Sequence, residues 1–162
     1  MEKEFDEIFS KLAQKIDSMI PVEWIELYYL GEVEKGRLSC SSVFYFTEKN
    51  NKSEFKRSHE IPLYYGVSDK VYMELLSELN NHLLELYDCF KLNEQELWEQ
   101  VSIYINNSGK LNIDFKYDVM NENDGGQVRR EAIWAYETFK YESKKGTYTR
   151  RILDEYIKEK SE

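Results

Sequence analysis

Apolar residues in this 162-residue chain switch repeatedly between helical and strand spacing, and these switches constrain the fold more than any other feature. Between residues 5 and 20 they recur every third or fourth position, which predicts an amphipathic helix ending before Pro21. Between residues 111 and 118 they alternate with polar residues, which predicts a strand with one solvated face. Its inward residues are expected to be Leu111, Ile113, Phe115 and Tyr117, and its outward residues Asn112, Asp114, Lys116 and Asp118.

The other segments complete an α+β fold by the same reasoning. Strands are predicted over residues 22–33, 38–46, 54–61 and 98–106, and helices over 68–90, 128–139 and 150–160, with Ser68 as an N-cap. Polar turns at 34–36 and 107–110 join strands into hairpins. The predicted order is α-β-β-β-α-β-β-α-α, with an antiparallel sheet of about five strands packed against helices. We expect one domain spanning residues 1–162.

The charge of the chain is strongly acidic, with a formal net charge of −9. Residues 85–124 hold nine acidic and three basic residues, so this stretch is the most acidic. Such a surface repels nucleic acid and attracts basic partners. The N-terminus lacks the apolar run of a signal peptide, and no window has the ~20 apolar residues of a membrane span. We therefore expect a cytoplasmic protein that binds neither nucleic acid nor membrane.

Few residues are suited to catalysis. His59 and His82 lie in no metal or catalytic motif, and a structural role is favoured for both. Gly125 and Gly126 precede a predicted helix, but the acidic residues beside them favour a loop over a phosphate site. Cys40 and Cys89 are expected to be free buried thiols. No cofactor or metal ion is predicted.

The acidic residues of the 114–124 region allow three interpretations. A solvated face that maintains solubility is favoured by the pattern alone, an anionic patch for Lys and Arg of a partner comes next, and a carboxylate metal site comes last. Trp134 lies off the apolar stripe of its predicted helix, which is typical of a half-buried packing residue and less often of an interface anchor. The acidic residues in question are Asp114, Asp118, Glu122 and Asp124.

Several short motifs, in order, resemble the YezG-like immunity protein (antitoxin) family. They are Ser18–Trp24 after the first helix, Glu60-Ile61-Pro62, and Trp98 before the second hairpin. Phe115-Lys116-Tyr117-Asp118 is similar to a Phe-x-Tyr-Asp element of that family, and an aromatic helix with Trp134 and Tyr136 follows. The resemblance covers nearly the whole chain. It departs after Asp118, where the sequence lacks an aromatic-rich continuation.

The resemblance implies a non-enzymatic cytoplasmic antitoxin of Gram-positive bacteria. Its partner would be a polymorphic toxin exported by type VII secretion, and the contact would be with a C-terminal nuclease domain. The expected partner-binding residues are Asp114, Tyr117, Asp118, Glu122, Asp124 and Trp134. Two other hypotheses remain open, namely an adaptor or chaperone of another basic protein and an enzyme with a carboxylate-bound metal. Oligomeric state is not predicted.

Overall fold

A computed structural model describes residues 1–162, and its largest feature is a five-stranded antiparallel sheet in the order β3-β2-β1-β4-β5. The strands are β1 (Trp24–Val33), β2 (Cys40–Glu48), β3 (Asn51–Arg57), β4 (Gln100–Asn106) and β5 (Leu111–Lys116). The long helices are α1 (Glu2–Met19), α3 (Asp69–Leu92), α4 (Gln127–Phe139) and α5 (Tyr148–Ser161). The predicted α+β class and element order are confirmed.

The chain divides into two compact units, residues 1–118 and 119–162. The first contains the sheet with α1 and α3, and the second contains α4 and α5. We call them the sheet unit and the helical unit.

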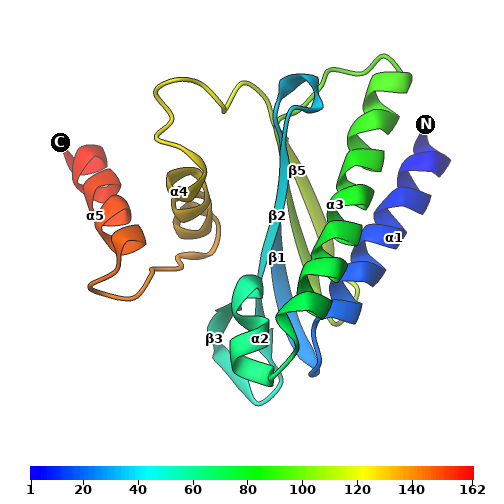
Figure 1. Ribbon diagram of the computed structural model, residues 1–162. Coiled ribbons are helices and arrows are strands. Elements are labelled where there is room, and N and C mark those ends of the chain that lie inside the picture. The colour runs from blue at the N-terminus through cyan, green and yellow to red at the C-terminus, as the bar shows by residue number, and fades with distance from the viewer. The chain divides into compact units, whose positions relative to one another are not determined.

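In the sheet unit, α1 and α3 lie side by side over one face of the sheet (Figure 1). The apolar stripe of α1 and that of α3 pack there on inward residues of the strands, because alternate strand residues share a face. Ser68 caps α3 as predicted, since its hydroxyl accepts from the Val71 N–H at 3.3 Å. The largest fully buried side chains include Leu12, Leu83, Trp98, Tyr29 and Phe44.

The third strand ends earlier than predicted. The sequence predicts a strand over residues 54–61, whereas β3 ends at Arg57 and a 3-10 helix, η2 (Ser58–Glu60), and a short helix, α2 (Ile61–Tyr65), follow. The Ser58 hydroxyl accepts from the Phe44 N–H at 3.0 Å and so takes the place of a ladder bond. Pro62 then sits in the first turn of α2, where a residue without an N–H is tolerated.

The last strand also ends early, and this changes one predicted orientation. The Glu99 N–H donates to the carbonyl of Lys116 at 2.9 Å, and β5 ends at that residue. Tyr117 therefore lies beyond the ladder and is 38% exposed, so the expectation that it faces the core is wrong. Leu111, at the other end of the strand, is likewise exposed rather than inward.

The helical unit consists of α4 and α5, which contact each other. Arg129 of α4 pairs with Glu159 of α5 at 3.3 Å and lies over the ring of Tyr156. Thr147 caps α5 by accepting from the Arg150 N–H at 3.2 Å, so this helix begins two residues before the predicted start.

Candidate partner-binding surface

The net charge is unequally divided between the two units. The sheet unit has 22 acidic and 13 basic residues, and the helical unit has nine of each. The sheet unit therefore carries the whole formal charge of −9, and the helical unit is neutral. A potential of this size attracts positively charged surfaces over roughly a Debye length, about 8–10 Å in physiological salt.

Three of the predicted partner-binding residues lie in the sheet unit, at β5 and just after it. Asp114 faces away from α1 and α3, because its neighbours Ile113 and Phe115 pack on the core, and it is exposed with no ionic partner. Asp118 is exposed as well, but its carboxylate accepts from Lys35 Nζ at 2.6 Å. That bond raises the pKa of Lys35. Together with exposed Tyr117, these residues form a polar surface with one free and one paired carboxylate.

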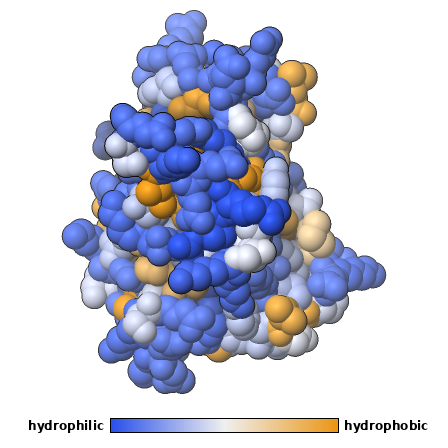
Figure 2. All heavy atoms as spheres, turned by 90° about the vertical axis from the view of Figure 1, so that its left-hand side faces the viewer, coloured by the Kyte–Doolittle hydropathy of each residue, from blue (hydrophilic) through white to orange (hydrophobic).

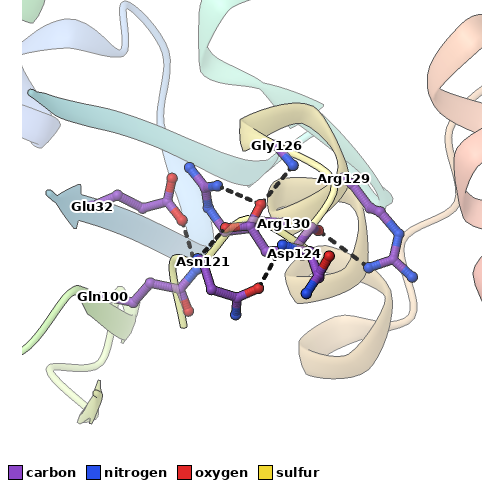
Figure 3. A network of polar contacts seen from close by, with 8 residues as sticks. Glu32, Gln100, Asn121, Asp124, Gly126, Arg129 and Arg130 are labelled. Atoms are coloured by element: carbon purple, nitrogen blue, oxygen red, sulfur yellow. Dashed lines mark hydrogen bonds and ion pairs between the residues drawn. The ribbon is translucent and has the colours of Figure 1, made fainter. Parts of the chain in front are cut away.

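The other predicted residues lie in the helical unit, where Asp124 has a structural position (Figure 3). Its carboxylate accepts from the Asn121 N–H at 2.8 Å, the Gly126 N–H at 2.6 Å and Arg130 Nη1 at 2.9 Å. Burial alone raises the pKa of Asp124, but the two backbone donors and the guanidinium outweigh burial and hold it below its ordinary value. The Asp124 carboxylate therefore stabilises the loop that precedes α4.

The remaining two residues have opposite surroundings. Glu122 is exposed and has no polar partner. Trp134 is only 4% exposed, and its ring packs edge-on against Phe139 at 5.5 Å. Val128, which the predicted apolar stripe places inward, is 46% exposed instead. The face of α4 that is buried is therefore centred closer to Trp134 than the sequence pattern indicates.

Sequence reasoning missed an aromatic cluster on the sheet face opposite α1 and α3. Tyr28 of β1 pairs in register with Tyr104 of β4, and their ring centroids are 4.8 Å apart. Phe55 of β3 lies 5.8 Å from Tyr28. All three side chains are partly exposed. The available signal was the alternation of Tyr28 with inward Leu27 and Tyr29, which places Tyr28 on the face of this strand opposite α1 and α3.

The same sheet face carries a buried polar pair. Glu32 of β1 is 3% exposed and accepts from Gln100 Nε2 of β4 at 2.7 Å (Figure 3). The pairing is in register, because these residues are opposite each other in the ladder. This hydrogen bond links the side chains of neighbouring strands.

The groups with catalytic potential have structural partners. His59 Nδ1 is 2.6 Å from the Tyr72 hydroxyl, and His82 Nδ1 is 3.0 Å from the Glu85 carboxylate. Cys40 and Cys89 are free thiols, of which Cys89 is buried and Cys40 partly exposed. Burial raises the pKa of both. No group of three or more His, Cys, Asp or Glu side chains is placed to hold a metal ion.

Apolar residues are scattered on the face drawn in Figure 2, where hydrophilic residues predominate and the hydrophobic ones form small separate spots. Surfaces of this kind bind partners through polar contacts around a few aromatic residues. None of the helices combines the length and hydrophobicity required to span a bilayer.

Comparison with known proteins identifies the family. The family described as "Immunity protein YezG-like" matches residues 5–153, which include nearly all of the sheet unit and most of the helical unit. The chain belongs to the YezG-like immunity protein family. The resemblance predicted from the sequence motifs is therefore confirmed.

Individual YezG-like relatives align along most of the chain. An Immunity protein YezG of Bacillus spizizenii is 31% identical over 154 residues, which cover 94% of this chain and 92% of the relative. The Type VII secretion system protein EsaG of Staphylococcus aureus is 28% identical over 167 residues, covering 99% and 98%. An Immunity protein YezG of Bacillus subtilis is 29% identical over 132 residues, covering 81% and 85%. These relatives support an immunity role for this YezG-like chain.

Proposed function

We propose that this protein neutralises a nuclease-type toxin by covering its nucleic-acid-binding cleft with the acidic sheet unit. The observation that carries the proposal is the concentration of the whole net charge in that unit of a YezG-like immunity protein. A nuclease needs a basic cleft to hold phosphates, and a surface of opposite potential associates with it rapidly. Neutralisation then requires binding alone, with no chemistry by the immunity protein.

We assign the contact with the toxin to those predicted partner-binding residues that are exposed. Asp114, Asp118 and Glu122 supply charge to the encounter, and Tyr117 supplies an aromatic contact. On binding, Asp118 exchanges its ion pair with Lys35 for one with a cation of the toxin. The free-energy cost of breaking the Lys35–Asp118 pair is small, because both of these side chains are mostly exposed.

Asp124 and Trp134 are assigned a supporting part within the helical unit. Their contacts hold the loop and helix that follow Glu122, so they act through the helical unit's own fold. We further infer that the two units serve as one immunity domain, because the family match includes both. The site of action is the cytoplasm, where a nuclease reaches nucleic acid. The relative from Staphylococcus aureus is named a type VII secretion system protein, which supports a toxin of that secretion route.

The test is co-expression with the neighbouring gene product, and a large secreted protein with a nuclease-like end encoded there favours the immunity role. We expect this chain to restore growth of cells that express the toxin domain and to co-purify with it. Co-purification without restored growth would favour the adaptor hypothesis, and growth inhibition that this chain leaves unchanged would contradict the proposal.

A matched pair of triple variants tests the assigned surface. Asp114→Lys, Asp118→Lys and Glu122→Lys reverse three exposed charges, and we expect them to weaken toxin binding by at least about tenfold. The control reverses Glu7, Glu74 and Glu155, which are also exposed, have no ionic partner and change the net charge by the same amount. Equal loss of affinity in the two triple variants would show that net charge matters but that this surface does not.

A further inference from the structure

A tyrosine pair on the face of the sheet opposite α1 and α3 lies beside a carboxylate that has no cation. Tyr28 and Tyr104 come from neighbouring strands, with ring centroids 4.8 Å apart and planes inclined by 48°. Glu26 is two residues before Tyr28 on the same face of β1 and is only partly exposed. The Tyr104 hydroxyl donates to Glu26 Oε2 at 3.1 Å, which holds the carboxylate beside the rings.

The Glu26 carboxylate forms no ion pair within the chain. Its one hydrogen bond uses one lone pair of one oxygen, and a carboxylate accepts about four such bonds. Its charge acts on the neighbouring tyrosine, since burial first and Glu26 second raise the pKa of Tyr28. A partly buried carboxylate without a cation is costly, so a site of this kind gains when a partner supplies the cation.

The same molecule contains this arrangement with its cation in place. Glu48 accepts a hydrogen bond from the Tyr65 hydroxyl and pairs with Lys56 Nζ at 2.6 Å. Lys56 Nζ also lies 5.1 Å from the ring centroid of Tyr64 and 5.7 Å from that of Tyr65. Carboxylate, tyrosine hydroxyl, two tyrosine rings and a cation are thus combined in one cluster. At Glu26 every part of the cluster except the cation is present.

We propose that Glu26, Tyr28 and Tyr104 form a receptor for an arginine side chain of the toxin, an inference that rests on the proposed function. The guanidinium donates to the Glu26 carboxylate and stacks on the tyrosine rings, which combines a charge-assisted hydrogen bond with a cation–π contact. Arginine suits the site better than lysine, because its planar group stacks on a ring and donates at the same time. The acidic sheet unit guides the cation to the site.

The first experiment measures affinity for an inactive form of the toxin domain by titration calorimetry. Glu26→Gln keeps the shape of the side chain and can still accept from Tyr104, but it removes the charge. We expect Glu26→Gln and Tyr28→Leu each to lower the affinity about tenfold or more. Glu74→Gln removes the same charge from the exposed surface of α3 and serves as the control, with a change of less than about twofold. Thermal unfolding of each variant confirms that it is folded.

The outcomes separate this inference from the proposed function. If the unaltered protein binds the toxin and Glu26→Gln binds it equally well, the receptor is refuted and the immunity role is retained. If the unaltered protein does not bind, the proposed function fails, and the second experiment decides whether the receptor exists.

The second experiment needs no toxin. N-acetyl-arginine methylamide is titrated into the protein while the ring signals of Tyr28 and Tyr104 are followed by nuclear magnetic resonance. We expect saturable shifts at these two rings at millimolar probe, and loss of the shifts in Glu26→Gln. The matching citrulline derivative is neutral and should leave the rings unchanged. Absence of saturable shifts with the arginine probe, or equal shifts with citrulline, would overturn the proposal.

Discussion

Gly31 is a glycine in the middle of a strand, where a larger residue is normally preferred, and its substitution gives the sharpest test of the packing. A Cβ at this position would lie 2.6 Å from Leu83 Cδ1 and 2.8 Å from the Tyr29 hydroxyl. Both of these side chains are fully buried, and Tyr29 is also hydrogen-bonded to Ser42 at 2.7 Å. Gly31→Ala therefore forces the Leu83 side chain or the Tyr29 ring to move.

The size of the effect follows from two opposing terms. Overpacking of a filled core costs about 1–3 kcal/mol, while replacing a strand glycine by alanine recovers about 0.5–1 kcal/mol of chain entropy. We expect Gly31→Ala to lower the free energy of unfolding by about 1–2 kcal/mol. Leu83→Ala alone should lower it by about 2–5 kcal/mol, because it leaves a cavity. In the double variant the new methyl group enters that cavity.

Urea unfolding followed by circular dichroism measures all three variants and the coupling between the two sites. We expect the double variant to lose at least about 1 kcal/mol less than the sum of the single losses. Lys52→Ala, on the exposed part of β3, is the control and should change stability by less than about 0.5 kcal/mol. Additive losses at Gly31 and Leu83 would refute the close approach of α3 to β1.

Three further predictions concern single polar contacts. Ser68→Ala should lower the free energy of unfolding by about 1 kcal/mol, measured by urea unfolding, because the first turn of α3 loses its cap. Asp124→Asn should speed hydrogen exchange at the start of α4 and destabilise the helical unit by about 1–2 kcal/mol, since its backbone and guanidinium donors lose a charged acceptor. The pKa of Asp124 is lowered in the folded protein. Its contribution to the free energy of unfolding is therefore complete above the ordinary pKa of 3.8 and is lost as the pH falls through the lowered pKa. Amide hydrogen exchange measured between about pH 6 and pH 3 should show this loss. Lys35→Ala should leave the urea midpoint unchanged, because both partners of the Lys35–Asp118 pair are mostly exposed, and a clear shift would contradict this.

Periodicity predicts the elements of this fold well where a segment has one buried face. The stripes of α1 and α3 and the alternation of β5 each follow from such a face, and their order is confirmed. It fails where a side chain competes with the backbone. The Ser58 hydroxyl accepts the hydrogen bond of a backbone N–H of β2 that would otherwise join the sheet ladder. The third strand therefore ends before residues 58–61, which the sequence pattern predicts as strand.

The candidate surface was predictable only in part, because a linear pattern does not say which charges already have a partner. Asp114 and Glu122 are exposed without ionic partners, whereas Asp124, only six residues before Arg130, is enclosed by hydrogen bonds of its own loop. The position of Trp134 off the apolar stripe favoured a half-buried packing residue over an interface anchor, and the ring is in fact buried. The arrangement of Glu26 with Tyr104 depends on strand register, since 78 residues separate the two in the chain.

The measurement that tests the central claim most directly is inhibition of the proposed toxin domain's nucleic-acid cleavage by the purified protein at two salt concentrations. We expect cleavage to stop when the protein reaches a stoichiometric amount at low salt. The inhibition constant should then rise by about tenfold or more between roughly 50 mM and 300 mM salt, because the proposed contact joins the acidic sheet unit to a basic cleft. Undiminished cleavage with excess protein, or inhibition that is independent of salt, would contradict the account.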